Sequence, residues 1–444
     1  MRNFVLPKIN KTILFPLADR LMKTNIVQYH KQITQMNTWS EEKIEEWRVQ
    51  RLSALLIHAY NNTDYYKDLF DKHNIVPINI KSMGILNNIP PLTKQIAKDN
   101  FDRLTSKNIN SLNYVIKNTG GSTGDPFKYF LDKRSWSYIV AAYWYYWKKI
   151  GYKMGEKYLA LGSHSILPSN NKSSLKYDIY YWLKGKCPLN AMNMSEEVAI
   201  NYLKYIKRRK INYVYGYASS IFLLAKAALN QDIKVDFIKA CITTSEILTP
   251  YYKETIIEAF NCTIIDAYSA ADGGINAFKI NDGEYEVGYN SYFRIKSENN
   301  SDEKLGVLQV TDLNNYAMPL INYENGDSVS MPVRRKSNYN GQVIDNVFGR
   351  ISDLIKLDNG NVLTGPGFTI FFKDIAVDAY AIKQGGPMEV IIEIIEAQNY
   401  KKENDDLIVQ TLKKYAGQDC KITLLKKEMF DHPHSGKRKY FISN

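Results

Sequence analysis

The chain has 444 residues, of which 45% are hydrophobic and 23% are charged. This length is compatible with two or three domains, and the composition is ordinary for a globular protein, which excludes wholesale disorder, a collagen-like chain and a long coiled coil. The formal net charge of +12 favours anionic partners such as nucleotides, nucleic acid or an acidic membrane surface, but selects none of them.

The first part of the chain is predicted to be helical. No apolar stretch approaches the roughly 20 residues needed to span a bilayer, and the segment Met1–Met22, interrupted by Pro7 and Pro16, makes a poor signal peptide. We expect this segment to pack on its own domain as an arm; the alternative is an amphipathic segment on a membrane surface. Ser40–His58 has the pattern of a helix that Ser40 caps.

From about Tyr158 onward, short apolar strands alternate with amphipathic helices. The expected strands are Tyr158–Leu161, Ile211–Tyr215, Ala240–Thr244 and Thr263–Tyr268. The expected helices between and before them are Ser195–Lys210, Ser219–Leu229 and Pro250–Phe260. This alternation predicts an α/β layered fold with mostly parallel strand pairing.

The pattern changes after Gly283 into strands separated by Asn, Gly and Asp turns. The expected strands of this small β-rich region are Glu286–Ile295, Gly306–Thr311 and Gln342–Val347. The elements expected after Arg350 are the strands Asp353–Leu357, Val390–Ile395 and Lys421–Leu425 and the helix Asp405–Tyr415. We therefore predict a large α/β body over residues 1–350 and a small α+β C-terminal domain over residues 353–444.

The basic run Lys204–Lys210 raises the question of nucleic-acid binding. It lies at the C-terminal end of a predicted helix, where the macrodipole favours cations, and it contains no interleaved exposed aromatic residues. We interpret it as a solvated helix end and expect no nucleic-acid partner.

The cysteine and histidine content bears on location and metal chemistry. Four cysteines form no CxxC pair and no disulfide framework in a chain of this length, which favours reduced thiols in the cytoplasm. Six histidines without an HExxH motif argue against a zinc site built from local motifs. We expect a cytoplasmic protein, with a peripheral position at the inner membrane face as the alternative.

The strongest local motif is a glycine-rich loop that follows the predicted strand Tyr114–Lys117. Its residues are Thr119, Gly120, Gly121, Ser122, Thr123 and Gly124. Glycines let backbone N–H groups approach an anion closely, and the hydroxyl groups add further donors. The loop has neither the Walker A ending nor the GxGxxG spacing, so on its own it indicates either a phosphate-binding loop or a plain turn.

Further short motifs follow in order along the chain. They are Thr244-Ser245-Glu246, Tyr268–Gly274, Thr311-Asp312-Leu313, Pro319–Asp327, Phe348–Asp353 and Ser435-Gly436-Lys437. With the glycine-rich loop, this set resembles the adenylate-forming ligase superfamily. The greatest likeness is to its phenylacetate–coenzyme A ligase-like branch, which includes the CapK-type proteins of capsular polysaccharide biosynthesis. The resemblance covers nearly the whole chain.

The resemblance implies an ATP-dependent ligase that activates a small carboxylic acid as an acyl adenylate. In that role Thr119–Gly124 would hold the β- and γ-phosphates of ATP. Glu246 and Tyr268 would border the adenine, with the Tyr268 ring stacked on it. Asp327 would accept hydrogen bonds from the ribose hydroxyls, and Arg350 would contact ribose or phosphate.

Two further residues would act on the charge that develops in the reaction. Asp272 would help to hold Mg²⁺, although a helix cap beside Gly273 explains it equally well. Lys437 would be the catalytic lysine of a mobile C-terminal domain, with the hinge at Ser352-Asp353. A carboxylate attacking the α-phosphorus of ATP brings two anions together, so Mg²⁺, a lysine and oriented N–H groups lower the barrier.

The sequence departs from the family pattern at several positions. Asn322 stands where Arg is common, Asp272 is one methylene shorter than the usual Glu, Ser269 replaces Gly, and Gly120-Gly121 replaces Ser-Gly. A relative that binds a nucleotide without catalysis is therefore an alternative. The acceptor is also open between coenzyme A and an amine or hydroxyl of a surface polysaccharide. Neither the acid nor the oligomeric state can be derived from the sequence.

Overall fold

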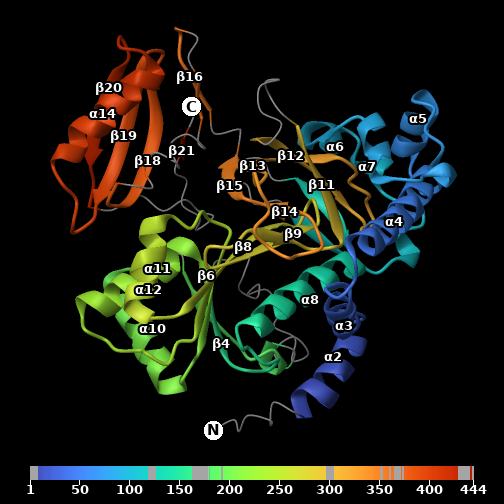
Figure 1. Ribbon diagram of the computed structural model, residues 1–444, viewed down its shortest axis with the longest axis horizontal. Helices are drawn as coiled ribbons and strands as arrows, with labels where there is room; N and C mark the ends of the chain where they lie inside the picture. Colours follow the sequence, from blue (N-terminus) through green and yellow to red (C-terminus); the bar gives the residue numbers. More distant parts are fainter. Residues whose placement is uncertain are drawn as a thin grey trace.

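The architecture was taken from a computed structural model. It describes residues 9–118, 127–162, 179, 181–191, 194–296, 305–350, 354–359, 362–364, 372, 375–428 and 441–442. Figure 1 shows N-terminal helices on one side, an α/β layer on the other and the C-terminal region beyond it. Among the described residues, no helix combines the length and the apolar character that crossing a membrane requires.

Helices form the N-terminal region, as expected. They are η1 (Asn10–Leu14), α2 (Phe15–Leu21), α3 (Ile26–Met36), α4 (Glu41–Asn62) and α5 (Asp64–Lys72). The Ser40 hydroxyl accepts a hydrogen bond from the Lys43 N–H at 3.3 Å, which confirms the predicted cap of α4. Phe15 is fully buried, and its ring packs edge-on against Trp144 of α8 (Lys133–Lys149) at 4.6 Å, so the N-terminal segment packs on its own domain.

Eight strands form the main sheet, in the order β14-β10-β9-β8-β7-β6-β4-β5. Five of them pair in parallel: β5 (Lys186–Asn190), β4 (Tyr158–Gly162), β6 (Tyr213–Tyr217), β7 (Ala240–Thr244) and β8 (Thr263–Ala270). The helices α10 (Glu196–Arg209), α11 (Ala218–Asn230) and α12 (Pro250–Phe260) cover one face, and α8 lies against the other (Figure 1). The predicted α/β layer is confirmed.

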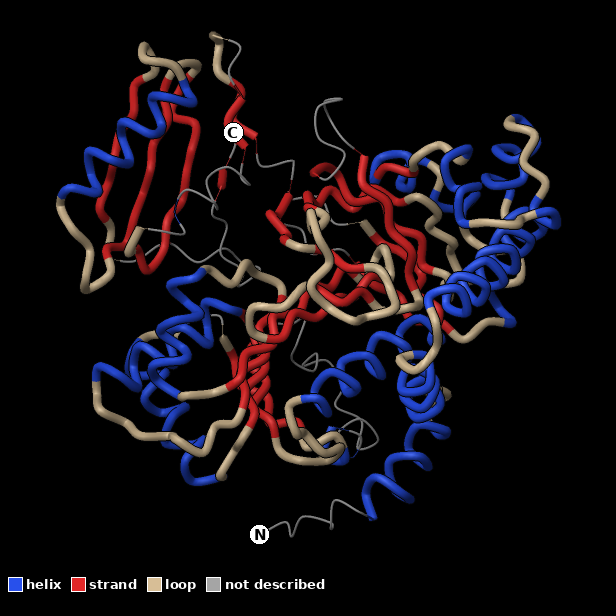
Figure 2. Tube along the Cα trace, in the orientation of Figure 1, coloured by secondary structure: helices blue, strands red, loops and turns tan. Residues whose placement is uncertain are grey.

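The rest of this sheet is antiparallel, and a second, five-stranded sheet lies beside it. The antiparallel strands of the main sheet are β9 (Ile275–Ile280), β10 (Tyr285–Val287) and β14 (Val343–Ile344). The second sheet contains β1 (Leu92–Thr93), β11 (Ser291–Lys296), β12 (Leu305–Asp312), β13 (Tyr323–Ser330) and β15 (Asn346–Arg350). Figure 2 shows how the two sets of strands meet at the centre of the molecule.

Two predicted strands are wrong, because each is split between the two sheets. Gln342–Val347 contains β14 of the main sheet and the start of β15 of the second sheet. Glu286–Ile295 is likewise two strands, β10 and β11, which belong to different sheets. The chain turns at Gly288, where a side chain would lie 2.2 Å from the Asn276 amide oxygen, so only glycine fits. A run of β-forming residues does not reveal such a break, because the close approach comes from a distant strand.

Short elements connect the N-terminal helices to the sheets. They are η2 (Pro77–Asn79), η3 (Met83–Asn88), α6 (Lys94–Asp99), α7 (Phe101–Leu104), η4 (Ile109–Ser111) and the hairpin of β2 (Tyr114–Asn118) and β3 (Lys128–Asp132). This hairpin brackets the glycine-rich loop, so the loop joins two adjacent antiparallel strands.

The C-terminal region has a hydrophobic core of its own, which includes Ile382, Ile392 and Leu412. Its sheet has the order β20-β19-β18-β21, from β18 (Val377–Gly386), β19 (Glu389–Glu396), β20 (Lys421–Lys426) and β21 (Phe441–Ile442). Helix α14 (Glu403–Ala416) packs on this sheet, and β16 (Leu354–Lys356) pairs with β17 (Val362–Thr364). The expected helix and the two expected strands in residues 390–425 are confirmed.

Candidate active site

The candidate site lies at the carboxyl ends of β6, β7 and β8. Parallel strands end at the same edge of a sheet, so the loops after them converge there, and ligands of α/β proteins bind at such edges. Residues from the neighbouring β13 complete the site. The structure brings Tyr268 and Asp272, at the end of β8 and just after it, close to Asp327 and the backbone of Arg350, which lie more than 50 residues further along the chain.

Asp327 and Tyr268 form the centre of this arrangement. The Tyr268 hydroxyl donates to Oδ2 of Asp327 at 2.6 Å, and Nδ2 of Asn325 donates to the same oxygen at 3.1 Å and to the Tyr268 hydroxyl oxygen at 2.8 Å. Burial and the adjacent carboxylate raise the pKa of Tyr268 far above its usual value, so the phenol stays protonated and donates. Asp327 is thereby held in one orientation, which suits an acceptor for a diol.

Arg350 lies directly across from Asp327. The two residues are register partners in the antiparallel pair of β13 and β15. The backbone of Arg350 is described and its side chain is not, so its predicted contact with ribose or phosphate stays a prediction. The pairing does place both proposed ribose contacts at one point of the sheet.

Asp272 lies in the turn after β8, and its Oδ2 accepts a hydrogen bond from the Tyr323 hydroxyl at 3.2 Å. Among the described residues, no group of three His, Cys, Asp or Glu side chains could hold a metal ion. A protein-only metal site is therefore absent from that part of the chain. Mg²⁺ in nucleotide enzymes commonly uses one or two carboxylates together with substrate phosphates, so a single Asp272 carboxylate is chemically suited to it.

The buried carboxyl group of Asp312 packs against the turn after β8, a role that the sequence did not indicate. Asp312 is 1% exposed, and burial raises the pKa of its carboxyl to about 7. It accepts hydrogen bonds from the Ser135 hydroxyl and from the Asn314 N–H, the latter at 2.9 Å. A side chain at Gly274, where φ is +67°, would lie 2.2 Å from the Asp312 carboxyl group, so the close approach requires glycine.

Glu246 follows β7 and reaches the same edge of the sheet. Its Oε2 accepts the N–H of Ser219 at 2.9 Å, at the first turn of α11. A carboxylate there is stabilised by the unpaired N–H groups and by the helix dipole. The structure thus assigns Glu246 a capping role, while its proximity to adenine stays a prediction. Nearby, the Tyr143 hydroxyl lies 3.5 Å from that of Thr244.

Asn322 has a structural role that the comparison with the family pattern did not reveal. Its side-chain amide donates to the carbonyls of Leu86 and Ile89 at 2.6 and 2.8 Å, and its N–H donates to the Thr311 hydroxyl at 3.0 Å. It is 1% exposed with φ at +52°, a conformation that Asn tolerates better than most residues. The amide therefore connects the η3 segment to the central sheets.

Several predicted site residues lie outside the described residues. They are Thr119, Gly120, Gly121, Ser122, Thr123 and Gly124 of the glycine-rich loop, Ser352 and Asp353 of the expected hinge, and Lys437. Their roles stay predictions.

Asp378 of β18, which the sequence did not single out, connects the C-terminal region to the body. Asp378, 6% exposed, forms an ion pair with Lys226 of α11 and accepts from the Tyr251 hydroxyl at 3.1 Å. Its backbone carbonyl accepts from the Tyr252 hydroxyl at 2.7 Å. Three contacts on one residue dock β18 against α11 and α12.

Comparison with known proteins agrees with this architecture. No protein-family model matches the chain. Protein CapK of Staphylococcus aureus is 23% identical over 390 residues, which cover 86% of this chain and 80% of CapK.

Solved structures of ligases share the fold over most of the chain. The structure of 2-hydroxyisobutyryl-CoA ligase with an acyl adenylate, in its postadenylation state, has a TM-score of 0.68 at 14% identity and covers 92% of this chain and 91% of its own. The same enzyme in its thioesterification state, with CoA, scores 0.57 at 15% identity and the same coverage. The amide bond synthetase McbA of Marinactinospora thermotolerans has a TM-score of 0.50 at 11% identity. The match covers 71% of this chain and 66% of McbA. The chain is thus a CapK homologue with the fold of the adenylate-forming ligase superfamily.

Proposed function

We propose that the protein is an AMP-forming ligase that activates a carboxylic acid with ATP and transfers the acyl group to coenzyme A. In the first step a carboxylate oxygen attacks the α-phosphorus of ATP, which forms the acyl adenylate and releases pyrophosphate. In the second step the acceptor sulfur attacks the acyl carbon, loses its proton and releases AMP. The observation that carries this proposal is the Tyr268–Asn325–Asp327 arrangement at the sheet edge, within a fold that acyl-adenylate-forming ligases share.

Each residue of the candidate site would contact a different part of the bound nucleotide. Asp327, oriented by Tyr268 and Asn325, would bind the ribose hydroxyls, with Arg350 opposite it. The loop Thr119–Gly124 would hold the phosphates through backbone N–H groups. Mg²⁺ would supply positive charge at the phosphates, and Asp272 is the carboxylate suited to hold it.

Lys437 would offset the charge that develops during adenylation, delivered by a mobile C-terminal domain that pivots at Ser352-Asp353. The higher TM-score against the postadenylation state than against the thioesterification state of the same enzyme indicates that this structure is nearer to the first of those two states.

The acceptor defines a second candidate function. The similarity to CapK and to an amide bond synthetase favours an amine or hydroxyl acceptor, such as a sugar of a capsular polysaccharide, in place of the thiol. Both candidates share the adenylation step and both would operate in the cytoplasm, where ATP is supplied.

Pyrophosphate exchange into ATP, driven by a panel of small carboxylic acids with Mg²⁺, tests the shared step. We expect exchange with at least one acid and a loss of roughly 100-fold or more in Lys437→Ala. Lys439→Ala, two residues away, is the matched control and should keep exchange. ATP binding without exchange for any acid would instead support a binding-only relative.

Mass spectrometry of the reaction product then identifies the acyl acceptor. With the identified acid, coenzyme A should yield a thioester and free AMP, whereas an amine or amino sugar should yield an amide. A product only with the amine would reject coenzyme A and leave the adenylation step intact.

A further inference from the structure

Buried polar side chains fix the turn after β8 that carries Asp272. The Asn290 side-chain amide donates to the Gly274 carbonyl at 2.7 Å, and the Asp312 carboxyl group packs against the same glycine. Asn290 and Asp312 are both buried, so water does not compete for these contacts. The position of the turn therefore depends on these two neighbours.

Asn290 holds two segments of the chain at once. Its side chain contacts the turn, and its backbone carbonyl accepts the Leu313 N–H at 2.8 Å. Asn290 lies between β10 and β11, where a side chain at Gly288 would lie 2.9 Å from the Asn290 amide oxygen. Glycine thus leaves the room that this amide occupies. Asn290 joins the Asp272 turn to the segment Asp312–Asn315.

Asn314 connects the same segment to helix α4. Its N–H donates to Oδ1 of Asp312 at 2.9 Å, and its amide oxygen accepts a hydrogen bond from Nη2 of Arg51 in α4. A guanidinium group donates strongly and in a fixed direction, so this contact sets the distance between the helix and the segment. Asn314 is buried, as Asn290 is.

Asn315 connects the segment to the hairpin that brackets the glycine-rich loop. Its amide oxygen accepts the Asp132 N–H at 2.9 Å, and its Nδ2 donates to the carbonyls of Phe130 and Met318 at 3.1 and 2.9 Å. Phe130 and Asp132 belong to β3, which pairs with β2 in this hairpin. One short segment therefore links the turn that carries Asp272 to the hairpin of the proposed phosphate loop.

We propose that Asn290, Asn314 and Asn315 are positioning residues that hold the Asp272 turn and the β2–β3 hairpin in one fixed arrangement, so that both can meet the Mg²⁺-bound phosphates of ATP. This inference rests on the proposed function and gives the three side chains no contact with substrate. Mg²⁺ demands nearly ideal octahedral geometry, so a small displacement of its carboxylate lowers affinity for the ion.

The same substitution at two buried asparagines tests the proposal. Asn290→Asp keeps the shape of the side chain but removes the donor to Gly274, so the Mg²⁺ concentration that half-saturates pyrophosphate exchange should rise roughly 10-fold. At saturating Mg²⁺, kcat should stay within about 2-fold of wild type. Asn314→Asp keeps the acceptor for Arg51, so its Mg²⁺ dependence should match wild type.

Two neutral variants complete this series. Asn290→Ala removes the donor without adding a buried charge, so it should follow Asn290→Asp even if the carboxylate impairs folding. Asn315→Ala frees β3 from the segment and should raise the half-saturating Mg²⁺ concentration by a similar factor.

Two further measurements do not require catalysis. In the free protein, the peptide that contains Asp272–Gly274 should exchange its amide hydrogens faster in Asn290→Ala than in wild type or Asn314→Asp. Calorimetry should show that Asn290→Ala binds Mg²⁺-ATP roughly 10-fold more weakly. If wild type catalyses exchange with no acid, the proposed function fails, while these two measurements still decide the positioning role.

A structural control separates positioning from stability. Asn340 also joins segments through its side-chain amide, which donates to the carbonyls of Met36 and Trp39 at 2.8 and 2.6 Å in the N-terminal region. Asn340→Ala should lower the unfolding temperature without changing the Mg²⁺ dependence. An equal shift in Asn340→Ala, or wild-type Mg²⁺ dependence in both Asn290 variants, would overturn the proposal.

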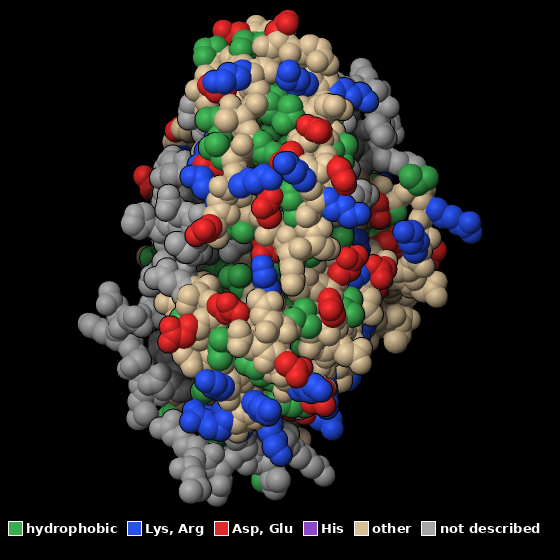
Figure 3. All heavy atoms as spheres, turned by 90° about the vertical axis from the view of Figure 1, so that its left-hand side faces the viewer, with side chains coloured by type: hydrophobic (Ala, Val, Ile, Leu, Met, Phe, Trp, Pro, Cys, Tyr) green, Lys and Arg blue, Asp and Glu red, His purple; other side chains and the backbone are tan. Residues whose placement is uncertain are grey.

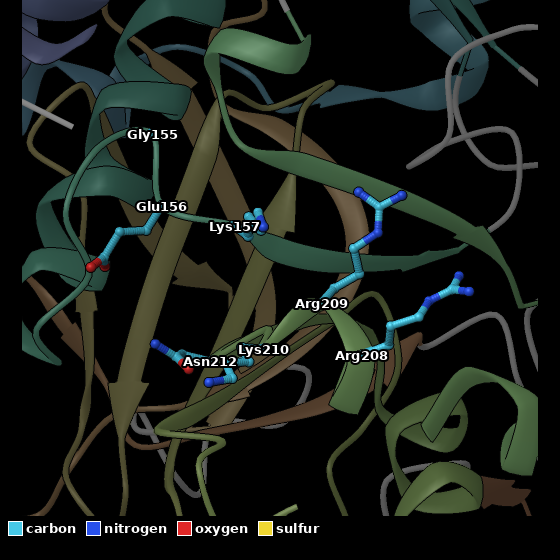
Figure 4. A pocket seen from close by; sticks show the side chains of 7 residues that line it. All are labelled: Gly155, Glu156, Lys157, Arg208, Arg209, Lys210 and Asn212. Atoms are coloured by element: carbon cyan, nitrogen blue, oxygen red, sulfur yellow. The ribbon is translucent and has the colours of Figure 1, made fainter. Parts of the chain in front are cut away.

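A surface control comes from the opposite edge of the main sheet. There Lys157, Arg208, Arg209 and Lys210 line a hollow of about 460 Å³, and Figure 4 shows Arg208 and Arg209 extending to one side of it. On the face in Figure 3, Lys and Arg side chains gather at the lower end. Lys157 and Asn212 immediately precede β4 and β6, whereas the site follows the carboxyl ends of β6, β7 and β8. Arg208→Gln should therefore match wild type in every measurement.

Discussion

The two edges of the parallel part of the main sheet have opposite chemistry. The carboxyl edge collects carboxylates, with Glu246 and Asp272 after β7 and β8 and Asp327 on the adjoining β13. The amino edge collects the cations Lys157, Arg208, Arg209 and Lys210. Helices of a βα layer begin at the carboxyl edge and end at the amino edge, so their dipoles favour this distribution. This cluster of positive charge therefore lies away from the candidate site.

Charge has a different role at each of the two edges. At the carboxyl edge each carboxylate has a specific partner, as Asp327 has in Tyr268 and Asp272 has in Tyr323. At the amino edge the α10 cations are exposed to water. Substitutions at the first edge should change chemistry or stability, whereas those at the second should change only association with anions.

The largest effect is expected at Asp312, through pH. Burial raises the pKa of this carboxyl from 3.8 to about 7, so the folded state binds its proton more tightly than the unfolded state does. Stability from this group is full below pH 4 and falls as pH rises toward 7, by up to about 4 kcal/mol. Asp312→Asn cannot ionise, so in urea unfolding its stability relative to wild type should rise across this range. A difference independent of pH would contradict the role of ionisation.

Asp327→Ala should have the next largest effect. It removes the acceptor proposed for the ribose hydroxyls and leaves Tyr268 and Asn325 without their shared partner, so kcat/KM for ATP in pyrophosphate exchange should fall roughly 100-fold. Asp282→Ala is the control, because that side chain is 93% exposed. Tyr268→Phe keeps the carboxylate and should cost only about 5-fold. If KM and kcat are unchanged in Asp327→Ala, the Asp327 carboxylate does not bind the nucleotide.

A smaller effect is expected where the C-terminal region meets the body. Asp378→Ala removes the partner of Lys226 and Tyr251 but keeps the backbone acceptor of Tyr252, which should weaken docking by about 1 to 2 kcal/mol. Fluorescence energy transfer between dyes on the two regions should then show a broader distance distribution. Asp406→Ala, at an exposed position of α14, should leave it unchanged. An unaltered distribution in Asp378→Ala would mean that other contacts hold the docking.

The smallest effect is expected from the cations of α10. Replacing Arg208, Arg209 and Lys210 by Gln should change the free energy of unfolding by less than about 0.5 kcal/mol, since exposed residues without ion pairs contribute little. Pyrophosphate exchange should match wild type within error, because this edge lies opposite the candidate site. A clear loss of exchange at saturating ATP would show that the two edges are coupled.

Much of the layered region could be predicted because local pattern and tertiary structure agree there. Ala240–Thr244 and Pro250–Phe260 have the predicted bounds, and the helix predicted over Ser195–Lys210 is α10, which Ser195 caps. The split of Glu286–Ile295 could not be predicted, since Gly288 turns the chain away from Asn276, a residue on another strand.

The candidate site shows the same division. The order of the motifs and the residue types of Asp272, Asp327 and Tyr268 are properties of the sequence, and they sufficed to indicate an adenylate-forming ligase fold. Asn325 and Asp312 stand within the same motifs, yet nothing in their spacing shows that one orients Asp327 and the other supports Gly274. Such contacts form only when strands distant in the chain pair.

The sequence by itself determined the alternation of strands and helices, the change to a β-rich region after Gly283 and the family likeness, because these depend on local periodicity and residue order. Only the tertiary structure decided that Asn322 connects the η3 segment to the sheets and that Asp378 docks the C-terminal region. The physical reason is that burial, pairing and the position of charge depend on which distant segments come into contact.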